Sequence, residues 1–217
     1  MNIKSTNGNG QSKPDSNSAT ALGRALLENW LADQPDNYFA RDLNLQRALE
    51  YLWGTERYRD HAPALLKFGA VLAAGVNQLV VEANEQGKTP QLERFDARGV
   101  RVERVSFHPS HHEAGRRIYG SGMMSAYRRP GNNLLSLAMF YLSAQNGEAG
   151  HNCPAACTAG LIKVLQAVGD PMLQRKYLPR LLESDYDRHF SGAQYLTEVQ
   201  GGSDVGANDT RATLVDP

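Results

Sequence analysis

The fold class of this chain is decided by the stretch Phe190-Ser191-Gly192-Ala193-Gln194-Tyr195-Leu196-Thr197-Glu198-Val199-Gln200-Gly201-Gly202-Ser203-Asp204. Apolar and β-prone residues run into two adjacent glycines flanked by the hydroxyl groups of Thr197 and Ser203, so the pattern predicts a strand that leads into a polar turn. Glycines let the backbone approach a ligand closely, and N–H and hydroxyl groups donate to phosphate oxygens or to a heteroaromatic ring. The alternative interpretation is an ordinary hairpin turn, in which the side chains of Ser203 and Asp204 hydrogen-bond their own backbone.

A family signature is carried by the same residues. Ala-Gln-Tyr-Leu-Thr-Glu followed by Gly-Gly-Ser-Asp resembles the flavin-binding signature of acyl-CoA dehydrogenases, because Thr, Glu, Gly, Ser and Asp fall at that family's spacing. Gln194 stands where the family usually has an aromatic residue, and Val199-Gln200 stands where it has Pro-Gly. Both departures resemble the AidB-type branch, flavoproteins linked to the bacterial adaptive response to alkylation damage. Residues 150–154 and 169–180 also resemble that branch, so the resemblance covers most of the chain from about Ala40 onward.

The resemblance implies an FAD site on this stretch. Leu196 and Thr197 would hydrogen-bond the pyrimidine edge of the flavin through backbone and hydroxyl groups. Ser203, with Gly202 before it, would meet the cofactor phosphate and border the entrance for the acyl thioester, so Ser203 is also the predicted substrate-binding residue. The predicted cofactor-binding residues are Gln194, Tyr195, Leu196, Thr197, Gly202 and Ser203.

No catalytic residue is predicted in this chain. The resemblance places the catalytic carboxylate in a C-terminal four-helix domain, which follows a helical domain and a middle β domain. Glu198 and Asp204 are instead interpreted as carboxylates that fix the turn.

The predicted fold is mainly α. It consists of an N-terminal helical bundle domain of the acyl-CoA dehydrogenase fold, residues 19–185, followed by the truncated start of a β domain, residues 186–217. A lone strand or two leaves unpaired edges, so we expect the β domain to be incomplete and the chain to be a fragment. Residues 1–18 are rich in Asn, Ser and Gly and are predicted to form a disordered leader.

Helical periodicity and helix boundary residues predict most of the elements. Residues 86–105 are polar, with glycine and proline breaks, and are predicted to be a loop with at most a small strand. Asp170 is expected to cap a helix that starts at Pro171. The predicted helices are 21–31, 43–52, a long apolar helix whose first turn holds Pro63, 110–127, 132–145, 154–168 and 171–177, with a last short turn that contains Leu181 and Leu182.

Composition excludes several classes of function. The 217 residues include 23 basic and 23 acidic side chains, so the neutral whole-chain charge gives no support to binding of nucleic acid or an anionic membrane. The chain has no P-loop lysine motif and no Gly-x-Gly-x-x-Gly, which argues against ATP and a Rossmann-bound cofactor. Two cysteines are too few for a secreted disulfide framework, so reduced thiols and a cytoplasmic location are expected.

No membrane span is expected. Residues 1–18 lack the apolar core of a signal peptide. The apolar run from Leu65 to Val81 is interrupted by Lys67, Asn77 and Gln78, short of the roughly 20 apolar residues that a bilayer requires. The sequence therefore predicts a soluble protein.

Metal sites are weighed against simpler interpretations. His151, Cys153 and Cys157 do not supply four zinc ligands, so buried helix thiols and a cap or core histidine are preferred. His108 and His112 have zincin spacing, but Pro109 lies between them, so residues 108–113 are interpreted as a solvated helix entry. No metal ligand is predicted.

Two further groups of residues have structural and functional interpretations. Apolar residues at helical spacing are expected in the bundle interior, although some could line an acyl pocket. They are Met123, Met124, Tyr127, Met139 and Phe140. Paired arginines could contact phosphate, but such pairs are common at exposed helix ends. They are Arg116, Arg117, Arg128 and Arg129.

The leading hypothesis is an FAD-binding, AidB-type acyl-CoA dehydrogenase-like protein that acts on CH–CH groups of acyl thioesters. Its small-molecule partner would be acyl-CoA-like, and the family commonly forms homo-oligomers. Because no catalytic base is identified, the chain alone is expected to be inactive. The alternatives are a non-enzymatic DNA-protecting protein of the alkylation response, which rests on the resemblance alone, and an inactive truncated remnant.

Overall fold

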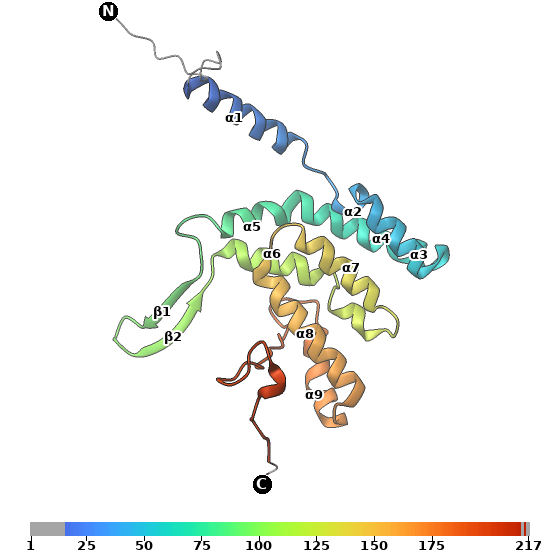
Figure 1. Cartoon of the computed structure of the whole chain (residues 1–217), viewed down its shortest axis with the longest axis vertical. Helices are drawn as coiled ribbons and strands as arrows, with labels where there is room; N and C mark the ends of the chain where they lie inside the picture. Colours follow the sequence, from blue (N-terminus) through green and yellow to red (C-terminus); the bar gives the residue numbers. More distant parts are fainter. Residues whose placement is uncertain (1–15, 214, 216–217) are drawn as a thin grey trace, which may run out of the picture. The chain divides into compact units, whose positions relative to one another are not determined.

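The computed structural model describes residues 16–213 and residue 215 (Figure 1). The chain divides into two compact units, Met1–Asp36 and Asn37–Pro217. Of the predicted disordered leader, residues 1–15 lie outside the described residues, and residues 16–18 begin the first helix.

The first unit contains one helix among its described residues, α1 (Ser16–Ala32). The helix predicted over residues 21–31 is therefore confirmed. Its large apolar side chains recur at the spacing of an amphipathic helix and are all more than half exposed. They are Leu22, Leu26, Leu27, Trp30 and Leu31.

The second unit is mainly helical, as predicted, and the described part of it contains one two-stranded sheet. Its elements are α2 (Tyr38–Arg41), α3 (Leu43–Trp53), α4 (Thr55–Val71), the π-helix η1 (Leu72–Val76), α5 (Asn77–Ala83), β1 (Gln91–Phe95), β2 (Arg101–Ser106), α6 (Pro109–Gly120), the 3₁₀ helix η2 (Ser125–Arg128), α7 (Asn133–Ala144), α8 (Ala149–Val168), α9 (Pro171–Leu181) and the 3₁₀ helix η3 (Val205–Ala207).

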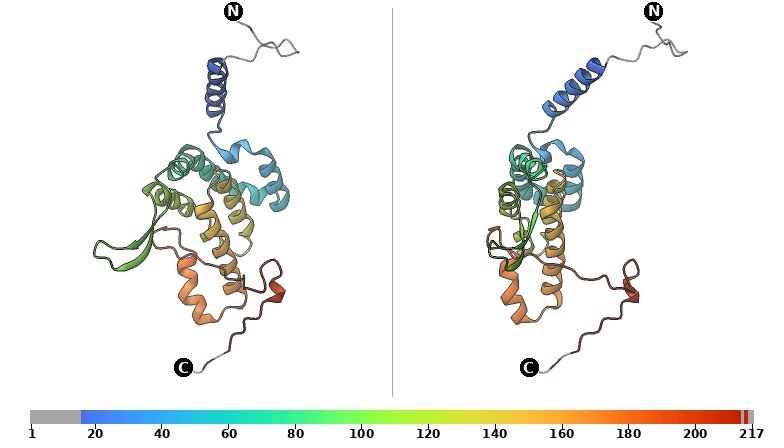
Figure 2. Two further views of the ribbon diagram at one scale, coloured as in Figure 1. Left: turned by 60° about the vertical axis from the view of Figure 1, so that its left-hand side comes forward. Right: turned by 90° about the vertical axis from the view of Figure 1, so that its left-hand side faces the viewer.

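The helices of the second unit pack into a bundle around one apolar core. Helix α6 packs along α5, α4 contacts α2, α3 and α7, and α8 contacts α6, α7 and α9 (Figure 2). Of the side chains predicted for the interior, Met123, Met124, Tyr127 and Met139 are buried, and Phe140 packs against them partly exposed. The fully buried large side chains are Tyr119, Phe39, Leu49, Leu65, Leu72, Ile118, Met123, Met124, Leu142, Ile162, Val76 and Thr158.

Two helices begin earlier than their prolines suggest. Pro63 and Pro154 are each predicted in a first helical turn, but α4 begins at Thr55 and α8 begins at Ala149. In α8 the Glu148 side chain accepts hydrogen bonds from the first-turn backbone, which fixes the earlier start. The predicted cap at Asp170 is confirmed, because its carboxylate accepts from the Met172 N–H at 2.7 Å.

The segment α4–η1–α5 forms one continuous helix, Thr55–Ala83, that is long and apolar enough by length and composition to cross a membrane. The sequence does not predict this, because polar residues interrupt the run. One face of the helix, with Leu65, Leu72 and Val76, is fully buried in the protein core. A buried stripe of this kind is typical of the core helix of a folded domain.

Residues 86–105 form more structure than the predicted loop. Strands β1 and β2 pair antiparallel, with Leu92 opposite Val105. Asp96 fixes the turn between them, because its carboxylate accepts from the N–H groups of Arg98 at 2.8 Å and Val100 at 3.0 Å. Gly99 adopts φ of +79°, which suits glycine.

The strand predicted at the start of residues 190–204 is not formed. The backbone from Phe190 to Glu198 runs without ladder pairing, and η3 is the only regular element among the described residues after α9. A strand needs a partner for its N–H and C=O groups, and this stretch instead lies against helix α8.

Candidate functional site

The stretch with the predicted flavin residues, 190–204, is anchored to the ends and sides of two helices. The Phe190 N–H donates to the Arg180 carbonyl of α9 at 3.1 Å. The Gly192 N–H donates to the Thr158 hydroxyl of α8 at 2.8 Å, and that hydroxyl donates to the Pro154 carbonyl at 2.7 Å. The buried Thr158 side chain thus links the stretch to the core of the bundle.

Glycines allow this stretch to approach α8 closely. A Cβ atom on Gly192 would lie 3.2 Å from the Cα atom of Thr158. A Cβ atom on Gly160 of α8 would lie 3.2 Å from Nε2 of Gln194. The predicted cofactor residue Gln194 therefore lies directly over the helix.

A tight turn brings the other predicted residues together. The Glu198 N–H donates to the Gly201 carbonyl at 2.8 Å, and the Gly201 N–H donates back to the Glu198 carbonyl at 3.3 Å. Behind this turn, a Cβ atom on Gly202 would lie 3.6 Å from Cγ2 of Thr197. The Thr197 side chain therefore lies beside Gly202, and the side chains of Thr197 and Ser203 are exposed.

The two carboxylates of the stretch brace the turn, as the sequence predicts. Glu198 Oε2 accepts from the N–H of Asp209 at 3.0 Å and of Thr210 at 3.3 Å. The pKa of Glu198 is lowered chiefly by the Thr210 hydroxyl and further by these backbone donors. Asp204 caps η3 by accepting from the Gly206 N–H at 3.2 Å.

Tyr195 and Leu196 complete the predicted cofactor set on the same exposed stretch. The Tyr195 side chain is 95% exposed and the Leu196 side chain is 58% exposed, so both are accessible to a ligand. The Leu196 carbonyl accepts from the Asn208 side-chain amide. The six predicted residues are thus all exposed, and their contact with FAD stays a prediction.

A second cluster of chemically active side chains lies where α6 meets α8. The rings of His111 and His151 stack with centroids 4.1 Å apart and 22° between their planes. Phe107 stacks on the other face of His111, at 4.4 Å and 16°. The prediction of a solvated helix entry at residues 108–113 is wrong for His111, which is half-buried inside this stack.

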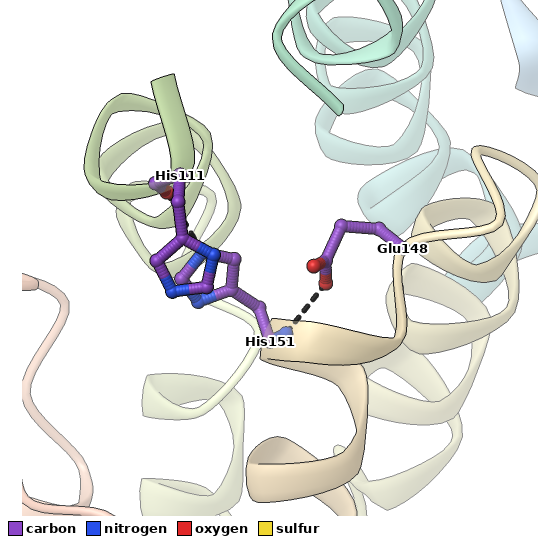
Figure 3. A group of neighbouring side chains, drawn as sticks. All are labelled: His111, Glu148 and His151. Carbon is purple, nitrogen blue, oxygen red and sulfur yellow. Dashed lines mark hydrogen bonds between the residues drawn. The ribbon is translucent and has the colours of Figure 1, made fainter. Parts of the chain in front are cut away.

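Glu148 joins the histidines from the start of α8 (Figure 3). Its Oε2 atom accepts from the N–H of His151 at 2.6 Å and of Asn152 at 3.3 Å. His151, Asn152 and Glu148 are all buried, as expected of a core histidine at position 151. Residues 111, 148 and 151 each offer a ligand atom, and these three atoms lie within 4.8 Å of one another.

Burial disfavours the protonated form of both histidines. Loss of solvent lowers the pKa of His111 to about 4, with further lowering by His151, and burial also lowers the pKa of His151. Burial raises the pKa of Tyr119 to about 12. Near neutral pH both imidazoles therefore keep an unprotonated ring nitrogen.

The cluster also supports the base of the predicted flavin stretch. Ser191 opposes the burial of Tyr119 of α6 by lowering the pKa of its hydroxyl, so the two side chains lie near each other. Its ring lies 5.7 Å from that of Tyr186, whose hydroxyl is 3.2 Å from Nδ1 of His112. The start of the predicted flavin stretch therefore lies close to the aromatic residues around His151.

We expect the stability of this domain to fall as the pH is lowered from about 7 to about 5. The ordinary pKa of His111 is 6.5 and its folded pKa is about 4, so the unfolded chain binds the proton more readily. Stability is therefore complete above about pH 6.5 and is lost progressively as the pH falls towards 4. Because His111 is only half-buried, solvent screening reduces the expected loss to about 1–2 kcal/mol.

Urea unfolding at several pH values measures this dependence, and His111→Phe is the matched variant because it keeps the stacked ring without the titrating nitrogen. The dependence of the free energy of unfolding on pH should be weaker in that variant. An unchanged slope would show that other groups cause the acid sensitivity.

The paired arginines and the two cysteines were the other candidate residues of the sequence. Arg116 pairs with Asp187 at 3.0 Å, and Arg117 pairs with Glu113 at 2.9 Å. Cys153 is exposed and Cys157 is half-exposed, so the prediction of buried helix thiols is wrong. The reason is that α8 turns Ala155, Thr158 and Ile162 towards the core instead.

Comparison with known proteins supports the resemblance. Residues 32–188, well over half of the chain, match the family model described as the adaptive response protein AidB N-terminal domain. The chain is 35% identical over 135 residues to the putative acyl-CoA dehydrogenase AidB of Escherichia coli, covering 57% of this chain and 25% of that protein. It is 29% identical over 192 residues to acyl-CoA dehydrogenase family member 11 of Caenorhabditis elegans, covering 83% of this chain and 30% of that protein.

Two solved structures have a similar fold. The apo form of Bd2924 superposes with a TM-score of 0.72 at 26% identity, over 81% of this chain and 35% of that chain. Caenorhabditis elegans ACDH-11 in complex with C11-CoA superposes with a TM-score of 0.70 at 25% identity, over 96% of this chain and 33% of that chain. The chain thus spans about a quarter to a third of the length of these relatives. It belongs to the AidB-type branch of the acyl-CoA dehydrogenase family and corresponds to that branch's N-terminal part.

Proposed function

We propose that this chain supplies an FAD-facing and acyl-thioester-facing surface of an AidB-type acyl-CoA dehydrogenase-like oxidoreductase. The observation that supports the proposal is the turn in which Thr197 lies beside Gly202, with Ser203 next in sequence and the side chains of Thr197 and Ser203 exposed. The turn offers two exposed hydroxyl groups and a glycine backbone, and these groups can donate hydrogen bonds to flavin and phosphate oxygens.

The exposed residues of the turn carry hydrogen-bonding groups of the kind that FAD requires. Thr197 and Leu196 would hold the ring edge, and Ser203 with the Gly202 backbone would hold the phosphate. A Cβ atom at Gly201 would lie 2.7 Å from the Asp204 carbonyl oxygen, so the turn leaves no room for a side chain there. These residues would hold FAD, which would supply the hydride-accepting chemistry of the family.

The part of this chain is to orient the ring and to leave one side of it open for the substrate. The relative ACDH-11 has been solved with C11-CoA, which supports a fatty acyl thioester as the substrate class. We assign no catalytic base among the residues described here, so we propose binding by this chain rather than independent turnover.

Titration of the 217-residue chain with FAD, followed by flavin fluorescence, tests the proposal. We expect saturable binding that Thr197→Val and Ser203→Ala each weaken about fivefold to tenfold, as for loss of one hydrogen bond of about 1 kcal/mol. Thr89→Val is the control, since Thr89 is an exposed threonine before the hairpin β1–β2. Equal affinity in all four proteins, or no saturable binding, would contradict the proposal.

A further inference from the structure

A small cavity adjoins the histidine cluster. It has a volume of about 170 Å³, and the residues that line it include Asn84, Lys88, Phe107, His111, Glu148 and Gly150. Lys88 is paired with Glu82 at 3.1 Å and Glu85 at 2.9 Å, so its charge is already balanced. His111 and Glu148, two of the three side chains drawn in Figure 3, line the cavity, and the His151 ring stacks on His111.

The hydrogen bonds of the cluster determine which nitrogen and oxygen atoms keep a lone pair for a ligand. His151 Nε2 lies 2.8 Å from the His111 backbone carbonyl, which can only accept, so Nε2 carries the proton and Nδ1 keeps its lone pair. Glu148 uses Oε2 to cap α8, and its Oε1 faces Gly150. His111 Nδ1 faces the same glycine, because a Cβ atom there would lie 3.5 Å from this nitrogen and 2.8 Å from Oε1.

We propose that His111, Glu148 and His151 form a binding site for a divalent transition metal ion, with Zn²⁺ as the best match. Two imidazole nitrogens and one carboxylate oxygen are the ligands of open zinc sites, in which the fourth position holds water. The cavity would supply that fourth position. The bond from His151 to a backbone carbonyl is the type of outer contact that orients metal-binding histidines.

The site requires a small closing movement. The three ligand atoms lie within 4.8 Å of one another, whereas bonds of about 2.1 Å to a tetrahedral zinc ion bring ligands to about 3.4 Å apart. The two rings are stacked with 22° between their planes, so their in-plane lone pairs do not converge on one point. The His111 ring must therefore turn towards the cavity, which is possible because it is half-buried and comes from the first turn of α6.

This site differs from the zinc site that the sequence argues against. That set combines His151 with Cys153 and Cys157, but the two thiols lie exposed or half-exposed on α8 whereas His151 is 3% exposed. The proposed ligands are His111 of α6 and Glu148 and His151 at the start of α8, and His111 and His151 are 40 residues apart in sequence.

Metal titration of the untagged full chain tests the proposal. The starting protein carries Cys153→Ser and Cys157→Ser, which removes competing thiols, and is stripped with EDTA before the chelator is removed. Zn²⁺ is added in competition with a chromophoric chelator, and Co²⁺ is added separately to read the coordination geometry from visible absorption. We expect one ion per chain and a Co²⁺ spectrum typical of four nitrogen and oxygen ligands.

Two variants locate the ion. His111→Phe keeps the aromatic stack but removes the nitrogen, and Glu148→Gln keeps a cap acceptor but removes the negative charge. Each should weaken Zn²⁺ binding at least about tenfold. His61→Gln, at a histidine that packs on Trp53, should bind Zn²⁺ like the starting protein.

Circular dichroism establishes that each variant is folded, and if His111→Phe unfolds, Glu148→Gln decides. The absence of stoichiometric Zn²⁺ binding by the starting protein would overturn the proposal. Unchanged affinity in the folded ligand variants would overturn it equally.

Discussion

Replacing Leu142 by alanine is expected to lower the free energy of unfolding by about 3 kcal/mol. Leu142 lies on α7, is 0% exposed and belongs to the core of the helical unit. The substitution removes buried apolar contacts and leaves a cavity that close-packed neighbours fill only in part. Urea unfolding followed by circular dichroism measures the change.

The control for this prediction is Leu137→Ala on the same helix. Leu137 is 56% exposed, so its truncation should change the free energy of unfolding by no more than about 0.5 kcal/mol. Helix propensity changes equally in the two variants and cancels in the comparison. Similar losses in both variants would show that α7 does not pack in the orientation described.

Replacing Gly115 by alanine is expected to destabilise the domain by about 1–3 kcal/mol through overpacking. A Cβ atom at this position of α6 would lie 2.5 Å from Cε2 of Tyr186 and 2.6 Å from Cε1 of His151. The two rings contact each other with centroids 5.5 Å apart, so they would have to move together. Thermal and urea unfolding measure the loss, and near-ultraviolet circular dichroism reports the displaced tyrosine.

Gly120→Ala, at the end of the same helix, is the matched control. A Cβ atom there would meet nothing within 4 Å. This variant should be neutral or more stable by up to about 1 kcal/mol, because alanine restricts the unfolded chain. If Gly115→Ala were as stable as Gly120→Ala, the close approach of α6 to His151 and Tyr186 would be wrong.

Helices were the most predictable part of this fold because their signals are local. Apolar residues at helical spacing define α1 and α3, and the Asp170-Pro171 pair places the start of α9. Pro63 and Pro154 misplaced two helix starts, since proline is common in a first turn yet both lie inside helices here.

Strands were predicted less well because pairing depends on residues distant in sequence. The hairpin β1–β2 has mixed polar and apolar side chains, with the Glu93 and Arg104 side chains paired across it, so its alternation is weak. The stretch from Phe190 has strong β-prone character, yet it lies on α8 without a strand partner among the described residues.

The two candidate sites also differ in how far they could be predicted from the sequence. The turn at Thr197–Ser203 could be predicted because a short signature holds all its residues. The cluster of His111, Glu148 and His151 could not, because tertiary packing of α6 on α8 brings it together. A glutamate just before a helix was the only local signal, and it indicates a cap rather than a ligand.

The most direct measurement is an ¹⁵N–¹H spectrum of the labelled chain recorded during addition of FAD. The proposed function predicts that the amide signals of Leu196, Thr197, Gly202 and Ser203 shift in proportion to bound FAD. Amides of the exposed hairpin β1–β2 should stay in place. Shifts confined to other parts of the chain, with these four amides unchanged, would contradict the assignment of this turn to the flavin.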